Sequence, residues 1–294
     1  MSFCGLPAGP PGPGTRAAIL GVPFDCGLHP DRVGAREGPA AVRRASRWLR
    51  RFPASGNGDA ALGIVDAGDV VLTPGRPARA FPLIEESAAR LHTAGAVPIG
   101  IGGDGAISLP LLRAAARFHQ ELCVIHVDAH TDAYLVDPEE PLNPATQFSH
   151  AASEGILDAT RSWHVGTRGF TYEAGVIART EALGYRVVTT DTLVARGFAQ
   201  TAAEIRETIG ARPAHLCWDM DIFDPSVAPG VCTPAWGGLT AREGVELLRA
   251  LQGPHYVGMD FNTVSPPHDV GEAAAQLCGH MIMEAFSLLP GTVP

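Results

Sequence analysis

The feature that most constrains the fold is a regular alternation of short apolar runs with longer stretches rich in Ala and Leu. Eight apolar runs of strand length, most of them flanked by Gly, Pro or Asp, lie at about 17–22, 62–66, 96–101, 122–127, 162–166, 186–189, 215–219 and 255–260. Stretches with helical spacing lie between them, at 38–51, 82–94, 109–118, 199–210, 241–252 and 271–288. This alternation is typical of a mostly parallel sheet covered on both faces, so we predict a three-layer α/β/α fold with eight strands.

Length and composition indicate one folded unit preceded by a short tail. The chain has 294 residues and 46% hydrophobic content, which is enough to bury a large core. Neither an internal repeat nor a break in composition marks a second domain, so we expect a single domain over 17–294. Residues 1–16 are rich in Pro and Gly, which cannot sustain helix or sheet pairing, and we predict that they form a disordered tail.

Charge and cysteine usage exclude several classes of partner. The formal net charge is −9 and the sequence contains no run of basic residues, so nucleic acid is not an expected partner. The six cysteines form no Cys-x-x-Cys pair, which favours a reduced, cytoplasmic location. No basic segment precedes an apolar stretch at the amino terminus, and no apolar run reaches membrane-spanning length, so we expect no membrane association.

Acidic residues and one histidine follow two of the apolar runs at the points where strands should end. Asp128, His130 and Asp132 come directly after 122–127, whereas Asp219 ends the run at 215–219 and Asp221 follows two residues later. Ligands of parallel α/β sheets bind outside the carboxyl ends of the strands. Carboxylates gathered there would repel one another and take up protons unless a divalent cation joined them. The spacing therefore favours a metal site, although Asp at a strand-to-helix junction also commonly caps a helix.

The order of the motifs resembles the ureohydrolase (arginase/agmatinase) family, and its opening segment is closer to the agmatinase branch. The matching segments include Gly21–Asp25, Gly34–Pro39, Asp66–Asp69, Gly102–Asp104, both Asp motifs, Ser149–His150, Gly166–Arg168, Asp224–Pro225, Gly237–Leu239 and Ser265–Pro267. The resemblance implies an arginase-like fold and hydrolysis of linear C–N bonds in a guanidino or amidino small molecule. It also implies a homo-oligomer, either a trimer or a hexamer.

The resemblance further implies two manganese ions that share a bridging hydroxide. Asp128 and Asp219 match the two bridging carboxylates of the family. His130 and Asp221 match the remaining ligands of one ion, and Asp132 matches a ligand of the other. Metal coordination lowers the pKa of bound water to about 7, which supplies the hydroxide that a poorly electrophilic guanidinium carbon requires. A carboxylate-rich donor set with some nitrogen suits manganese.

Departures from the family pattern predict a changed site. Gly105 stands where the family has a histidine ligand, so one of the two ions is expected to bind weakly or not at all. Thr263 replaces the glutamate that pairs with the guanidinium, and a charge-assisted hydrogen bond contributes about 1.5–3 kcal/mol against about 1 for a neutral one. Substrate specificity should therefore differ. We predict that Thr263, Asn262 and His268 bind substrate, with His268 a possible metal ligand, and that His150 is the proton-handling catalytic histidine.

Three functions remain open on the sequence alone. The first is a manganese-dependent amidinohydrolase with altered substrate specificity. The second is a hydrolase with a single ion that acts on a non-guanidinium substrate. The third is a non-catalytic scaffold or regulatory protein that keeps the fold. Two residues close to the motifs are expected to be structural instead: His126 as a hydrogen-bonded core histidine, and Trp218 in the packing of the sheet.

Overall fold

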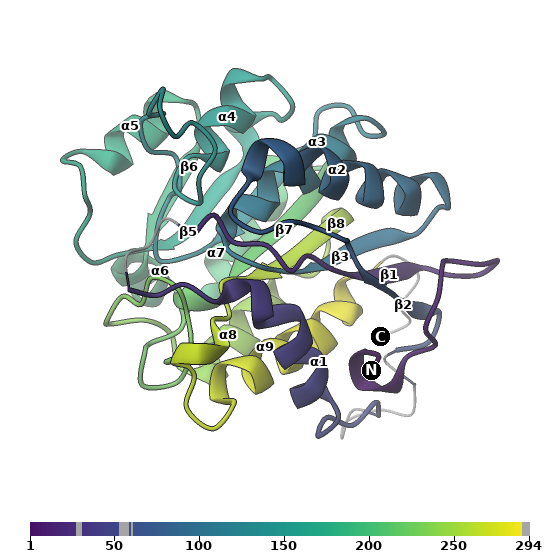
Figure 1. Cartoon of the computed structure of the whole chain (residues 1–294). Coiled ribbons are helices and arrows are strands. Elements are labelled where there is room, and N and C mark those ends of the chain that lie inside the picture. The colour runs from purple at the N-terminus through teal and green to yellow at the C-terminus, as the bar shows by residue number, and fades with distance from the viewer. Residues whose placement is uncertain (28–30, 53–58, 60, 290–294) are drawn as a thin grey trace.

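The chain folds around one sheet of eight parallel strands, as predicted. The computed structural model describes residues 1–27, 31–52, 59 and 61–289 (Figure 1). Along the chain the strands are β1 (Ala17–Gly21), β2 (Ile64–Asp69), β3 (Val97–Ile101), β4 (Cys123–Val127), β5 (Trp163–Thr167), β6 (Arg186–Thr189), β7 (Pro213–Asp219) and β8 (His255–Asn262). Their order in the sheet is β2-β1-β3-β8-β7-β4-β5-β6, and every neighbouring pair is parallel.

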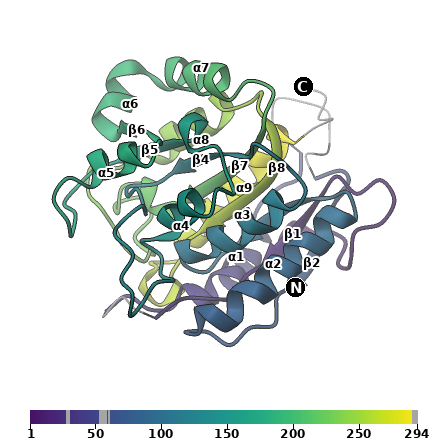
Figure 2. The same cartoon turned by 90° about the horizontal axis from the view of Figure 1, so that it is seen from above.

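Helices cover both faces of the sheet. The six predicted ones are α1 (Gly38–Ser46), α2 (Pro77–Thr93), α3 (Ser108–Ala116), α7 (Phe198–Ile209), α8 (Ala241–Ala250) and α9 (Ala273–Ala285). Three further helices of seven residues each are α4 (Gln147–Ser153), α5 (Val176–Ala182) and α6 (Thr190–Arg196). Helices α1, α8 and α9 lie on one face and α2, α3 and α4 on the other (Figures 1 and 2). No helix in the described ranges is both long and apolar enough to cross a bilayer.

Strand residues alternate between two apolar cores. In β1, Ala17 and Ile19 pack in the core beneath α1 and α9, whereas Ala18 and Leu20 pack in the core beneath α2 and α3. Successive side chains of a strand point to opposite faces, so a strand that is buried on both sides reads as a continuous apolar run. This explains why the strands could be predicted from short apolar runs without polar alternation.

The prediction of a disordered tail over residues 1–16 is wrong. Phe3 is fully buried and meets Phe286 edge to face, with ring centroids 6.2 Å apart. The amide of Phe3 donates a hydrogen bond to Asp66 Oδ2 at 2.7 Å, and the amide of Cys4 donates to Ser46 Oγ at 2.7 Å. Pro and Gly prevent regular structure here, yet an irregular segment is fixed by side-chain acceptors and one aromatic anchor. Residues 290–294, at the end of the predicted domain, lie outside the described residues.

Replacing Phe3 with alanine tests whether this segment belongs to the core. Loss of a buried phenylalanine side chain leaves a cavity, so Phe3→Ala should lower the free energy of unfolding by about 3–5 kcal/mol. Urea denaturation measures the change. Phe170→Ala is the control because Phe170 is fully exposed, and its free energy of unfolding should stay within about 0.5 kcal/mol of wild type. Equal midpoints for Phe3→Ala and wild type would show that the segment is not packed.

Candidate metal centre

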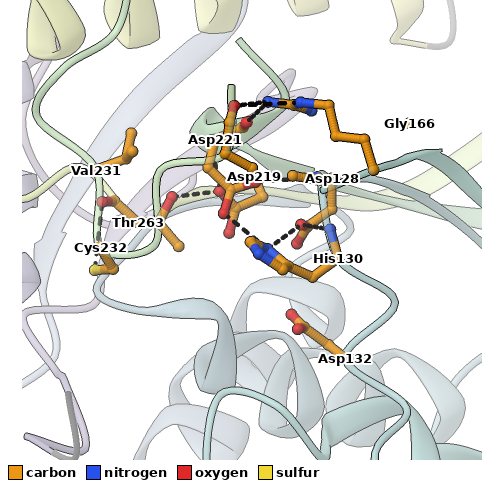
Figure 3. A network of polar contacts seen from close by, with 12 residues as sticks. Asp128, His130, Asp132, Gly166, Asp219, Asp221, Val231, Cys232 and Thr263 are labelled. Atoms are coloured by element: carbon orange, nitrogen blue, oxygen red, sulfur yellow. Dashed lines mark hydrogen bonds and ion pairs between the residues drawn. The ribbon is translucent and has the colours of Figure 1, made fainter. Parts of the chain in front are cut away.

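The ends of two neighbouring strands bring the five predicted metal-binding residues together. In the parallel pair β4·β7, Val127 lies opposite Trp218, so the next residues, Asp128 and Asp219, are adjacent. Figure 3 shows Asp128, His130, Asp219 and Asp221 as one group, with Asp132 below His130. All five line one cavity of about 290 Å³. Trp218, which directly precedes Asp219 in β7, is fully buried, as expected.

One half of the site is formed by Asp128, His130 and Asp221. His130 Nδ1 lies 3.1 Å from Asp128 Oδ1 and 3.1 Å from Asp221 Oδ2. One potential ligand atom from each of the three residues lies within 4.8 Å of the other two. The amide of Ala129 also donates to Asp221 Oδ1 at 3.1 Å, which ties the loop after β4 to the loop after β7. Two carboxylates and one imidazole are thus placed to hold a single cation.

The second half shares Asp128. Ligand atoms of His126, Asp128 and Asp132 also lie within 4.8 Å of one another. His126 Nε2 is 2.9 Å from Asp128 Oδ2 and 4.0 Å from Asp132 Oδ2, while His126 Nδ1 lies 2.9 Å from His164 Nδ1. His126 is therefore a buried, hydrogen-bonded histidine, as expected, but its other nitrogen faces the carboxylates.

Thr263 holds Asp219 from the end of the neighbouring strand β8. The Thr263 hydroxyl donates a hydrogen bond to Asp219 Oδ1, which also accepts from the amide of Asp221 (Figure 3). Thr263 has a φ of 67°, a region that β-branched residues rarely adopt. Its backbone is fixed there by hydrogen bonds to Gly103 O and from the amide of Cys232. Strained backbone of this kind is frequent at functional sites.

Burial and crowding dominate the electrostatics. Burial raises the pKa of Asp132 and Asp219 well above the usual carboxyl range, and the nearby carboxylate of Asp128 raises it further. Burial acts on Asp128 in the same direction, but the imidazoles of His126 and His130 outweigh it and hold the pKa of Asp128 well below its usual value. The cluster without a cation therefore keeps protons that a divalent ion would displace.

The donor set fits a divalent cation. It combines carboxylate oxygens with imidazole nitrogens, which suits manganese among the common ions. Asp128 Oδ2 is buried and accepts no well-aligned hydrogen bond, although His126 Nε2 lies 2.9 Å away. Buried polar atoms are normally paired, so this carboxylate oxygen, at the point common to both halves, is placed to act as a ligand for a cation.

Three predicted site residues are not among those that line the cavity. His150 Nε2 lies 2.6 Å from Pro141 O, so the ring is held by its own loop. Asn262 directs its amide to Asp260 Oδ1 at 2.7 Å. It precedes Thr263 at the end of β8, and consecutive strand residues point to opposite faces. His268 ends a short 3-10 helix that starts at Pro266 and is half-buried outside the cavity. In the described part of the chain, no hydrogen bond or ion pair joins these three side chains to the five metal-type residues, although the backbone of Asn262 pairs with that of Asp219 in the sheet.

Other residues that line the cavity escaped the sequence analysis. They include Arg32, Tyr134 and Asn143. Gln147, which contacts the cluster from α4, was also missed. The only available signal was proximity in sequence, since Tyr134 follows the Asp128–Asp132 motif by two residues and Arg32 precedes the Gly34–Pro39 segment by two. Their positions depend on loop geometry that a single sequence does not reveal.

Neutralising one carboxylate distinguishes the electrostatic repulsion among the aspartates from their contribution to metal binding. Asp219→Asn removes a charge but keeps an oxygen for the two hydrogen bonds of Asp219. At pH 8 the metal-free variant should gain about 1.4 kcal/mol in free energy of unfolding for each unit by which the folded protein raises the pKa of Asp219. Wild type should gain about 2.7 kcal/mol from Mn²⁺ at 100 times its Kd, and the variant should gain far less. Thermal denaturation with EDTA and with Mn²⁺ measures both effects.

The control is Asp191→Asn, which removes an exposed carboxylate of α6. It should respond to Mn²⁺ as wild type does. An Asp219→Asn variant that Mn²⁺ stabilises as much as wild type would contradict the assignment of Asp219 to the metal centre.

Comparison with known proteins agrees with this geometry. The sequence model of the Arginase family matches residues 15–287. The chain is 36% identical to guanidinopropionase of Pseudomonas aeruginosa, over 98% of this chain and 91% of that protein. It is 38% identical to agmatinase of Neisseria meningitidis serogroup C, over 92% and 86%. The solved structure of proclavaminate amidino hydrolase from Streptomyces clavuligerus matches with a TM-score of 0.92 and 33% identity, over 98% and 96%. The chain therefore belongs to the arginase family.

Proposed function

We propose that this protein is a manganese-dependent hydrolase that cleaves a guanidino acid into urea and an amino acid. Water adds to the guanidinium carbon, and the bond between that carbon and the alkyl nitrogen of the substrate breaks. The guanidinium carbon leaves as urea, and the alkyl nitrogen becomes the amine of the amino acid. The observation that carries the substrate class is Arg32, which places a positive charge on the wall of a cavity that six aspartates also line. The similarity to guanidinopropionase supports the same class.

The charge distribution of the cavity suits a substrate with both charges. Six aspartates line it, and Arg32 is the single arginine among the described lining residues. The guanidinium of Arg32 is held by two backbone carbonyl groups, because Nε donates to Val231 O at 2.9 Å and Nη2 donates to Pro229 O at 2.8 Å. A guanidinium group is drawn towards the aspartates and a carboxylate towards Arg32. A guanidino acid carries both groups and is neutral overall.

A substrate with two positive charges fits this cavity less well. The family's guanidinium-pairing glutamate is Thr263 here, and the Thr263 hydroxyl is already engaged with Asp219. Asp25 and Asp104 also line the cavity, but Asp25 is paired with Arg36, and Asp104 accepts hydrogen bonds from the amides of Cys26 and Ala106. The amine of agmatine would therefore lie near the positive charge of Arg32, and no unpaired carboxylate would be available to form an ion pair with it. These features favour guanidino acids over agmatine.

The chain's own residues position the reactants. Asp128, His130 and Asp221 would hold one ion, and Asp128, Asp132 and Asp219 would hold the other. When bound, the metal would supply hydroxide near neutral pH by lowering the pKa of coordinated water to about 7. Burial raises the pKa of Tyr134 to about 12, so its hydroxyl keeps its proton in the cavity and can donate a hydrogen bond to substrate. Thr263 keeps the Asp219 carboxylate in place.

Urea release from matched substrates tests the proposal. With Mn²⁺ present, kcat/KM for 3-guanidinopropionate or 4-guanidinobutyrate should exceed that for agmatine by about tenfold or more, since a charge-assisted contact contributes about 1–2 kcal/mol beyond a neutral one. Arg32→Gln should lower kcat/KM for the guanidino acid by about the same factor. For the amide derivative of that acid, which lacks the carboxylate charge, Arg32→Gln should change kcat/KM much less.

Arg242→Gln serves as the matched control because Arg242 is an exposed residue of α8. Its kcat/KM should equal that of wild type for every substrate. Faster urea release from agmatine than from the guanidino acids, or an Arg32→Gln variant with unchanged selectivity, would contradict the proposed substrate class. If the protein released no urea from any guanidino compound, the proposed activity itself would be wrong.

A further inference from the structure

The side chain of Gln147 lies over Gly105, where the family's histidine ligand would begin. Gly105 opens a short 3-10 helix that ends at Ile107. A β-carbon added to Gly105 would lie 3.0 Å from Gln147 Nε2 and 3.3 Å from Asp132 Oδ2. Both distances are tighter than ordinary contacts. The space next to Gly105 is thus filled by the amide of Gln147 and the carboxylate of Asp132.

The amide of Gln147 is only half satisfied. The residue is 1% exposed, and its Nε2 donates to Asp132 Oδ2 at 2.7 Å. Its Oε1 is buried and accepts no hydrogen bond. A buried acceptor without a partner costs roughly 1–3 kcal/mol and calls for an explanation. An amide oxygen is a hard ligand of the kind that manganese, magnesium and calcium bind.

Helix α4 fixes Gln147 beside the metal cluster. Gln147 is the first residue of α4, and the amide of the next residue, Phe148, donates to Asp132 O at 3.1 Å. The Phe148 ring packs against His126, with centroids 4.3 Å apart. The backbone of the Asp132 loop and the start of α4 are therefore joined, and Gln147 cannot leave the site without breaking this contact.

We propose that the side-chain oxygen of Gln147 replaces the missing histidine and completes the ion site formed by Asp128, Asp132 and Asp219. The inference rests on the proposed function for the presence of the metal. A half turn of the terminal amide exchanges its oxygen and nitrogen at little steric cost, because the two atoms have nearly the same shape. Nitrogen faces Asp132 when no ion is bound, and oxygen faces the ion when one is. The chain then binds two ions despite Gly105.

His126 is the other nearby donor, and its contacts give it a different role. Its Nε2 lies 2.9 Å from Asp128 Oδ2, so it contacts that carboxylate directly. Its Nδ1 is occupied by His164. Among the described residues, Gln147 is the one that combines contact with Asp132, proximity to Gly105 and an unpaired oxygen.

Metal counting with two variants of Gln147 tests the proposal. Equilibrium dialysis against Mn²⁺ followed by elemental analysis should give two ions per chain for wild type. Gln147→Leu should lose the second ion, with affinity reduced more than 100-fold, since removing a group that only orients a ligand costs about 10–100-fold. Gln147→Glu should keep both ions because a carboxylate is also a manganese ligand. The spin-coupled manganese signal in electron paramagnetic resonance should follow the same pattern.

The glutamate variant distinguishes a ligand from a residue that only positions Asp132. An ionised glutamate cannot donate a hydrogen bond and would repel Asp132. If Gln147 were only a donor, Gln147→Glu would lose the second ion as Gln147→Leu does, and the proposal would be overturned. Gln276→Leu, an exposed site on α9, is the control and should bind two ions. Circular dichroism should confirm that all variants fold.

A rescue experiment completes the design. The double variant Gly105→His/Gln147→Ala makes room for an imidazole and should regain the second ion. Two ions in Gln147→Leu, or one ion in wild type at saturating Mn²⁺, would overturn the role of Gln147. If wild type with one ion still releases urea from guanidino acids, only this inference fails. If wild type binds no metal and releases no urea, the proposed function fails with it.

Discussion

The crowding of buried carboxylates at the ends of β4 and β7 is the constraint on which the site depends. Parallel pairing of the two strands makes Asp128 and Asp219 neighbours, and both are almost fully buried. Backbone amides reinforce the arrangement, because the amides of Ala129 and Asp221 donate to carboxylates of the cluster. Like charges this close in a medium of low dielectric constant are costly unless a cation joins them. The fold thus maintains an electrostatic cost that metal binding would relieve.

Much of the fold and the five metal-type residues could be predicted because their signals are local. An apolar run followed by Asp gives both a strand and the residue at its end. The helices α4 to α6 were missed because seven residues give too little periodicity. The position of Phe3 was missed because it depends on Phe286, far away in the sequence. Asn262 directs its side chain to Asp260 rather than into the cavity, because strand alternation separates it from Thr263.

Gly105 and Thr263 show why a lost motif residue is ambiguous in a sequence. Each is visible only as an absence when compared with the family. In the structure, Gln147 fills the space over Gly105, and Thr263 takes up a hydrogen bond to Asp219. Gln147 is far from Gly105 in the sequence, and Asp219 is far from Thr263. A single sequence therefore does not reveal that these residues are in contact. A scaffold without catalytic function would have no need to keep four buried aspartates and a half-buried histidine at one cavity, which favours the hydrolase.

Anomalous X-ray diffraction at the manganese absorption edge tests the central claim most directly. Crystals grown with Mn²⁺ should show two anomalous peaks, both in contact with Asp128. One peak should also touch His130 and Asp221, and the other should touch Asp132, Asp219 and Gln147. The absence of any peak within bonding distance of Asp128 would contradict the account, because the carboxylate cluster would then have no role as a metal centre.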